Sequence, residues 1–142
     1  MRDADPGEGS LPGGGPWSID HVQVAIPPGG EERARGYWVG LMGFEEQPKQ
    51  AAMAVRGGAW FRRGAVQVHV GIEADLHPWT KAHIAFRLGS AAAIDALARH
   101  LQGAGYAVRF VEDELPGWRR FFSEDPFGNR MEFMAPDRGS PP

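Results

Sequence analysis

Three histidines and one glutamate occupy positions where strand side chains would point away from an apolar core. His21 and His83 open two segments of alternating apolar and polar residues, and His69 and Glu132 lie within two later segments of the same kind. Strand side chains alternate between two faces, so each of the four points away from its apolar neighbours. Neutral imidazoles and a carboxylate suit a divalent transition metal, which makes these residues candidate metal ligands.

His21, His83 and Glu132 alone form a two-histidine, one-carboxylate set, and His69 would add a third nitrogen. A hexacoordinate ion would then keep positions for water or substrate. A divalent ion with one carboxylate ligand has a net charge of about +1, so the metal would favour an oxygen-bearing anionic substrate and act as a Lewis acid. The metal is left open among Zn, Ni, Mn and Fe. The reaction is left open among isomerisation through an enediolate, opening of an epoxide and, with Fe(II), oxygen insertion.

The elements that must position these residues repeat along the chain. A strand at 19–26, a helix at 31–42 and strands at 44–47, 59–62 and 66–70 are followed by a strand at 81–88, a helix at 91–102 and strands at 106–111, 118–123 and 130–135. His83 follows His21 by 62 residues and Glu132 follows His69 by 63, an agreement that indicates an internal repeat. We therefore predict an α+β fold, in which two βαβββ repeats form a curved, cavity-lining mixed sheet. If the two halves curve toward each other, the four candidate ligands converge, either within one chain or across two.

The domain organisation follows from composition. The 142 residues suffice for one domain, which we place at 17–135 with halves at about 17–72 and 80–135. Residues 1–16 are rich in glycine and proline, which predicts a disordered N-terminal tail, and 136–142 read as a short C-terminal tail.

Charge and composition exclude several functions. The net charge of -3 argues against nucleic acid as a partner, and the absence of cysteine excludes disulfides, thiolate metal sites and cysteine nucleophiles. No apolar run reaches the roughly 20 residues that span a bilayer, and the N-terminus does not read as a signal peptide. A cytoplasmic protein with a small-molecule ligand is the resulting expectation.

Three motifs within this doubled pattern carry a family resemblance. Ile19–Val22 opens the first half, Ala82–Phe86 opens the second, and the sequence Asp-Pro-Phe-Gly-Asn-Arg-Met-Glu-Phe closes it at 125–133. Together they resemble the vicinal oxygen chelate superfamily over about residues 18–136. That group includes glyoxalase I, fosfomycin-resistance transferases, extradiol dioxygenases and bleomycin-binding proteins.

The resemblance implies a glyoxalase-like fold, a homodimer and a bound divalent metal. It maps the metal ligands of the opening strands onto His21 and His83, and the glutamate of the closing motif onto Glu132, which is also our candidate catalytic residue. Glyoxalase I carries a further glutamate ligand where this chain offers His69. A second carboxylate that would serve as a base is therefore missing at that position.

Other polar and aromatic residues on the same strand faces are candidates for substrate binding: Gln23, Trp60, Gln67, Arg87, Arg120 and Phe122. Alternatives remain for several residues. Trp60 suits the core equally well, Arg119 and Arg120 read as a solvated pair, and Glu132 would also suit a structural role in holding a buried arginine such as Arg120 or Arg130. We expect His77 and His100 at the surface and Asp125 in a turn.

The predicted function is that of a small-molecule metalloenzyme of the glyoxalase or dioxygenase type, acting as a lyase or isomerase, a transferase or a dioxygenase. The alternative is a metal-free drug-binding protein like those of bleomycin resistance. Its apolar groove would lie at a dimer interface and be formed by Trp60, Trp118, Phe121 and Phe122.

Overall fold

The structure is a computed structural model and describes residues 15–78 and 81–137. Most of the two predicted tails, 1–14 and 138–142, lies outside the described residues. Pro136, which we assigned to the C-terminal tail, is instead the last residue of a strand. No helix within the described ranges is long and apolar enough to cross a membrane.

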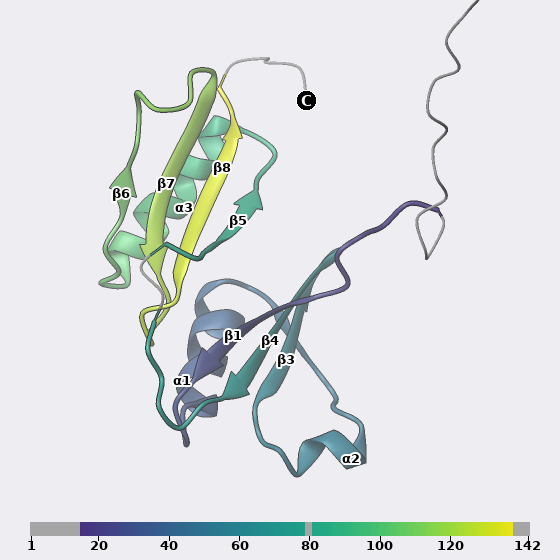
Figure 1. The fold of residues 1–142 in the computed structure, drawn as a ribbon. Helices are drawn as coiled ribbons and strands as arrows, with labels where there is room; N and C mark the ends of the chain where they lie inside the picture. Colours follow the sequence, from purple (N-terminus) through teal and green to yellow (C-terminus); the bar gives the residue numbers. More distant parts are fainter. Residues whose placement is uncertain (1–14, 79–80, 138–142) are drawn as a thin grey trace, which may run out of the picture.

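The chain folds into two halves, each built on a four-stranded mixed sheet (Figure 1). The first half comprises β1 (Val22–Ile26), α1 (Glu31–Arg35), η1 (Gly36–Leu41), β2 (Glu45–Gln47), α2 (Ala51–Ala54), β3 (Ala59–Arg63) and β4 (Val66–Ile72). The second comprises β5 (Ile84–Arg87), α3 (Ala91–Gly103), β6 (Arg109–Phe110), β7 (Trp118–Glu124) and β8 (Arg130–Pro136). The strand orders are β1-β4-β3-β2 and β5-β8-β7-β6, which confirms the predicted pair of βαβββ repeats.

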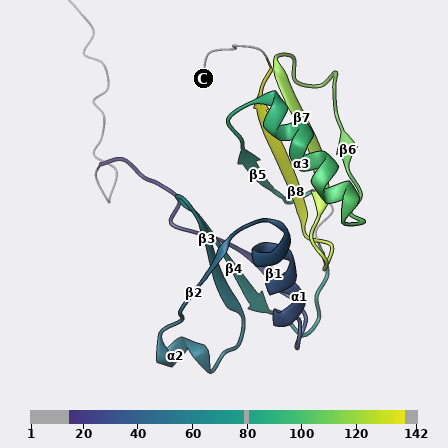
Figure 2. The same cartoon turned by 180° about the vertical axis from the view of Figure 1, so that it is seen from behind.

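The two sheets stay open toward each other. β1 and β5 are the outer strands of their sheets, each paired in parallel on one side only, with β4 and β8 respectively. Figures 1 and 2 show the two halves as separate lobes that meet near the end of β1 and the start of β8. A cavity of about 630 Å³ lies between the two outer strands and is lined on opposite sides by Val22, Gln23, His83 and Ile84, among others. Both outer edges are therefore available for further pairing.

One helix covers each sheet. Ser90 caps α3, because its hydroxyl oxygen accepts a hydrogen bond from the Ala93 amide at 3.1 Å. Ile94, Ala98 and Leu101 are buried on the inner side of α3, which packs on β7 and β8. α3 therefore covers one face of the second sheet, and the polar side chains lie on the opposite face.

The first helix differs from its predicted α-helical pattern. After Arg35 it continues as a π-helix, in which the Met42 amide donates to the Tyr37 carbonyl at 2.8 Å. The wider turn buries both Tyr37 and Trp38, whereas spacing at 3.6 residues per turn selects only Trp38. Gly43 ends the helix with a φ of 70°.

Two further strand or helix assignments needed correction. The predicted strand 106–111 is reduced to Arg109–Phe110, and the Ala107 carbonyl before it accepts a hydrogen bond from the Ser123 hydroxyl at 2.7 Å. α2 was not predicted, because its residues are exposed and show no helical periodicity of apolar side chains. His100 is exposed, as expected, yet its Nε2 lies 2.8 Å from the Leu41 carbonyl oxygen and so links α3 to η1.

Replacing Gly58 with alanine should destabilise the first half. Gly58 has a φ of 77°, and a Cβ there would overlap the carbonyl oxygen of Val70 on β4. We expect a loss of more than about 1 kcal/mol in the free energy of unfolding, measured by urea denaturation. Gly89→Ala is the matched control, because a Cβ at Gly89 meets nothing within 4 Å. Equal stability of the two variants would contradict the expectation.

Candidate functional site

The first half brings His21 and His69 together as a stacked pair. Their ring centroids lie 4.0 Å apart and their planes differ by 15°. Trp60, which is opposite His69 on β3, also stacks on His69, with a centroid distance of 4.6 Å. His21 Nδ1 lies 2.8 Å from the Asp20 carboxylate. His69 is buried, whereas the His21 side chain is 42% exposed and remains accessible to a ligand.

This stack limits what His69 can do. A histidine binds a metal through a lone pair that lies in the plane of its ring. Two nearly parallel rings stacked face to face therefore do not direct their nitrogens at one ion. As described, His69 supports and orients His21, and ligation of one ion by both would require the stack to open. Its role as a ligand stays a prediction.

The second half brings His83 and Glu132 together. His83 Nε2 lies 3.0 Å from Glu132 Oε2, and Arg120 Nη1 donates to Glu132 Oε1 at 2.9 Å. Glu132 and Arg120 are buried, and Arg120 Nη2 also donates to Glu114 at 3.0 Å. The face of the second sheet that is turned away from α3 thus holds a buried carboxylate between an imidazole and a guanidinium.

Both ring nitrogens of His83 face acceptor oxygens. Nδ1 lies 2.8 Å from the Lys81 carbonyl oxygen, and Nε2 faces Glu132. A neutral imidazole has one N–H group, so it satisfies only one of the two contacts. The other contact requires an added cation between nitrogen and oxygen, which is either a proton or a metal ion. Metal-bound histidines commonly donate their second nitrogen to a backbone carbonyl, as His83 Nδ1 is placed to do.

Arg120 is not part of a solvated pair with Arg119, as one interpretation of the sequence had it. Arg119 faces α3 and bonds Asp95 at 2.9 Å, whereas Arg120 points to the opposite face of β7 and is buried against Glu132. The alternation of strand side chains separates the two neighbours. The structural role considered for Glu132, holding a buried arginine, is therefore observed.

The Phe122 ring lies beside this pair and is surrounded by guanidinium groups. Its centroid is 5.3 Å from that of His83, edge to face. The guanidinium carbons of Arg130, Arg109 and Arg120 lie 4.1, 5.0 and 5.5 Å from the same centroid. Arg109 and Arg130 were missed as candidates. Arg109 lies opposite Phe122 in the pairing of β6 with β7, but this neighbour can be identified only once the strand register is known.

The other predicted substrate-binding residues divide between the halves. Gln23 is paired with His69 in the β1–β4 register, and Gln67 Nε2 donates to the Asp20 carbonyl at 3.4 Å. Both lie near His21 with Trp60. Arg87 belongs to the second half, where its guanidinium lies 5.0 Å from the Trp118 ring. The candidates are thus distributed in two groups, one around His21 and one around His83.

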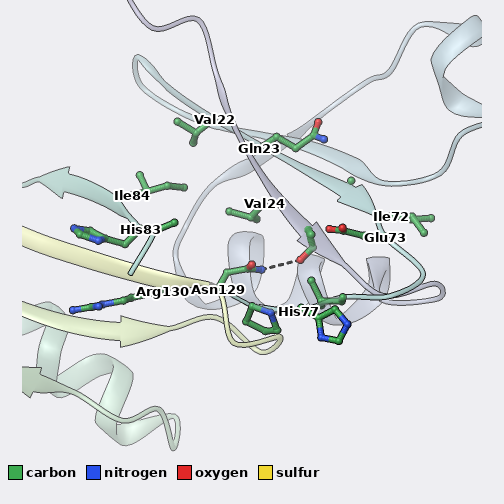
Figure 3. A pocket seen from close by; sticks show the side chains of 15 residues that line it. Val22, Gln23, Val24, Ile72, Glu73, His77, His83, Ile84, Asn129 and Arg130 are labelled. Atoms are coloured by element: carbon green, nitrogen blue, oxygen red, sulfur yellow. Dashed lines mark hydrogen bonds between the residues drawn. The ribbon is translucent and has the colours of Figure 1, made fainter. Parts of the chain in front are cut away.

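The four candidate ligands form two pairs and not one cluster. Over the ranges 15–78 and 81–137, no group of three or more His, Cys, Asp or Glu side chains is placed to hold a metal ion. His83 extends with Arg130 in one direction, away from Val22 and Val24 of β1 (Figure 3). Convergence of all four within one chain is not what the structure describes.

The closing motif connects the halves at its turn. Asp125 lies in a turn, as predicted, and its carboxylate accepts hydrogen bonds from the amides of Phe127 and Asn129 at 2.9 and 2.8 Å. Burial raises the pKa of Asp125 above its ordinary value. Asn129 Nδ2 donates to the Ala25 carbonyl at 2.8 Å across the cavity (Figure 3). His77 is exposed at the rim of the same cavity, as expected.

His69 should make the metal-free protein less stable at low pH. Burial is the main cause that lowers the pKa of His69, and the nearby His21 lowers it further. The unfolded chain protonates this histidine near its ordinary pKa of about 6.5, which the folded chain resists. Stability is thus full above that pH and falls as the pH drops below it. Urea unfolding of wild type and His69→Phe across this range should show a weaker pH dependence in the variant. An unchanged profile would contradict this, with His77→Gln as the exposed control.

Comparisons with known proteins agree with this architecture. The family model of the Glyoxalase/Bleomycin resistance protein/Dioxygenase superfamily matches residues 18–133. A protein from Bacillus anthracis assigned to the glyoxalase family is 40% identical, with a TM-score of 0.79 over 87% of this chain and 98% of that chain. A search of curated proteins gave no match.

More distant solved structures share the fold. The fosfomycin resistance protein FosX from Listeria monocytogenes is 14% identical, with a TM-score of 0.69 over 84% of this chain and 93% of that chain. A FosX mutant solved with Mn(II) and dihydroxypropylphosphonic acid, also 14% identical, has a TM-score of 0.71 over 84% and 92% of the two chains. The matched family model covers most of the chain, and the relative from B. anthracis is 40% identical to it. This chain therefore belongs to the glyoxalase/bleomycin resistance protein/dioxygenase superfamily.

Proposed function

We propose that this protein is a metal-dependent enzyme that acts on a small, oxygen-bearing anionic substrate. The observation that carries the proposal is the His83–Glu132 pair, in which both nitrogens of His83 face acceptor oxygens. A divalent ion, Zn, Ni, Mn or Fe, would replace the extra proton that this pair otherwise needs. His83 and Glu132 would hold it, with His21 as the third protein ligand.

The donor set fits such an ion. Imidazole nitrogens and carboxylate oxygens bind these metals at roughly 2.0–2.2 Å, so neighbouring ligand atoms on one ion lie about 3 Å apart. The distance of 3.0 Å between His83 Nε2 and Glu132 Oε2 meets that requirement. Arg120 occupies Oε1 and leaves Oε2 for the ion. This separation of His83 and Glu132 supports their proposed role as two of the ligands.

We propose that a second copy of the chain supplies His21. His21 belongs to the first half, and the described residues of a single chain do not gather three ligands. Among residues 15–78 and 81–137, no strand pairs with the outer edges of β1 and β5. Ile19 and Trp17, just before β1, are 80% and 82% exposed. Unpaired edges and exposed large apolar side chains favour association, so a homodimer would join the first half of one chain to the second half of its partner.

Each side chain then has a separate task. A bound divalent ion would act as a Lewis acid, which stabilises negative charge on a substrate oxygen. Glu132 contributes a ligand oxygen, and Arg120 neutralises its other oxygen. His69 and Trp60 orient the His21 ring by stacking. Lyase or isomerase, transferase and dioxygenase chemistry are all compatible with this arrangement.

The ligands bound to one structural neighbour support a divalent metal in general terms. The FosX mutant was solved with Mn(II) and a phosphonic acid that carries hydroxyl groups. At 14% identity this neighbour supports the fold and the kind of chemistry that the fold accommodates, not the identity of the ion in this chain.

Thermal unfolding with added metals tests the proposal. An ion that binds only the folded state stabilises it by about 2.7 kcal/mol at 100 times its dissociation constant. We expect at least one of Zn(II), Ni(II), Mn(II) and Fe(II), the last under anaerobic conditions, to raise Tm clearly in untagged protein. An unchanged Tm with every ion would contradict the proposal.

A metal-free binding protein is the second candidate, and one observation favours it. Arg120 donates to Glu132 at 2.9 Å and so places a guanidinium charge against this carboxylate, as it would in a site that binds a ligand without metal. Light scattering should show a homodimer for either candidate. The metal-binding experiments separate them, because only the enzyme requires an ion at His83 and Glu132.

A further inference from the structure

We propose that Arg109, Arg130 and Phe122 form a binding subsite for the oxyanion group of the substrate, a carboxylate or a phosphoryl group. This deepens the proposed function, because it assigns a place and a charge to one end of the substrate. The juxtaposition that supports it is three guanidinium groups around one phenyl ring, next to the His83–Glu132 pair.

The sheet register creates this arrangement. Arg109 of β6 is opposite Phe122 of β7, which in turn is opposite Glu132 of β8. Side chains at directly opposed positions lie on the same face of a sheet. The row therefore runs from an exposed arginine through an aromatic ring to the buried glutamate.

Contact with the Phe122 ring restricts the side chains of Arg109 and Arg130. A guanidinium group stacks on an aromatic face and keeps its N–H groups directed outward in the plane of the group. Arg130 lies closest, with its guanidinium carbon 4.1 Å from the Phe122 centroid. Such stacking restricts the side chain before any ligand binds, so less conformational entropy is lost on binding.

A cavity opens at this position. A pocket of about 700 Å³ is lined by Arg109, Phe122 and Arg130 together with Tyr106, Glu124 and Asp125. Two acidic residues also line the pocket. Asp125 directs its carboxylate to the amides of Phe127 and Asn129 in the turn, and Glu124 lies opposite Arg130 in the register of β7 and β8, where it is one negative charge beside the two arginines. The cavity is large enough for a small organic anion.

A separate observation comes from Arg120. It is only 8% exposed, and its Nε is buried without a hydrogen-bond partner among the described residues. Buried donors of this kind are rare unless a ligand or water completes them. The same Arg120 guanidinium is the third one around Phe122, and it also donates a hydrogen bond to Glu132.

The positive charge on this face exceeds the negative charge. Register places Arg87, Arg109, Arg120 and Arg130 on the face that carries Glu124 and Glu132, and Glu114 reaches Arg120 from a neighbouring loop. Four cations thus face three anions before any metal binds. An oxyanion between Arg109 and Arg130 would lie beside His83, so the rest of the substrate would reach the proposed metal ligands.

Titration calorimetry of the metal-free protein at constant ionic strength tests this subsite. Inorganic phosphate and acetate are the probes, and EDTA keeps metal absent. We expect at least one of them to bind wild type, and to bind Arg109→Gln and Arg130→Gln at least about tenfold more weakly, because each variant removes one charge-assisted contact. Arg99→Gln, on the exposed side of α3, is the matched control and should bind as wild type does.

The outcomes separate this inference from the proposed function. Stronger binding of phosphate assigns a phosphoryl group, and stronger binding of acetate assigns a carboxylate. Absence of binding for both, or equal binding by wild type and both arginine variants, would overturn the subsite. Since metal is absent throughout, a protein that binds the anion but no metal would retain this inference and lose the proposed function. A protein that binds metal but neither anion would do the reverse.

Discussion

Glu132→Gln should lose most of its affinity for a divalent metal while the fold is retained. The change keeps the size of the side chain and an acceptor for Arg120, but it removes the charge and a good ligand oxygen. With one ligand of three impaired, we expect metal affinity to fall by at least about 100-fold. Titration of both proteins with Zn(II) and Mn(II), alongside circular dichroism, measures this directly.

Arg120→Met is the matched control for that experiment. It removes the other partner of the buried pair and should destabilise the fold by about 3 kcal/mol or more, since Glu132 is left without its guanidinium. It keeps both His83 and the carboxylate, so metal binding should persist. If Glu132 has only a structural role, the two variants will both be destabilised and will not differ from wild type in metal affinity. That result would remove Glu132 from the site.

Metal binding should be restored when two deficient variants share one dimer. His21→Ala lacks the ligand of the first half, and His83→Ala lacks one ligand of the second half. If each site joins the first half of one chain to the second half of the other, a mixed dimer contains one intact site and one site that lacks both. We expect each variant alone to bind poorly and the heterodimer to bind about one ion.

Heterodimers can be isolated through two different peptide tags that do not bind metal. A mixed dimer of His77→Ala with wild type serves as the control and should bind as the wild-type dimer does, since His77 is exposed and belongs to neither pair. A site formed within one chain predicts a different result, because every chain in the mixed dimer would carry a defect. Absence of restored binding would thus contradict a site shared between chains.

The features that depend on alternation and repetition could be predicted from the sequence. The spacing of His21, His69, His83 and Glu132 indicated the doubled βαβββ order, and the strand alternation placed Phe122 on the face that carries Glu132. Both follow from local geometry that every strand obeys. The cap at Ser90 and the positive φ of Gly43 are equally local features, which residue type at a helix end favours.

Features that depend on long-range geometry could not be predicted in this way. Alternation shows which face carries Glu132, but not that Arg120 lies 2.9 Å from its carboxylate. The stacking of His21 on His69 depends on the approach of the segment before β1, which no periodicity encodes. The arginines around Phe122 required the register of β6 on β7, and that strand is only two residues long.

The orientation of the two halves is also a long-range property. The sequence indicated two sheets that face a common cavity, yet within the described residues β1 and β5 have no strand partner on their outer edges. One chain contains the same strand pattern whether the sheets close within it or across a dimer.

The metal content of the protein tests the central claim most directly. Protein purified without a metal-binding tag, loaded with each candidate ion in turn and freed of excess by gel filtration, can be analysed by inductively coupled plasma mass spectrometry. Metal bound by His21, His83 and Glu132 predicts close to one ion per chain for at least one metal, and loss of that ion in Glu132→Gln. Protein that retains no ion after loading with Zn(II), Ni(II), Mn(II) and anaerobic Fe(II) would contradict the claim.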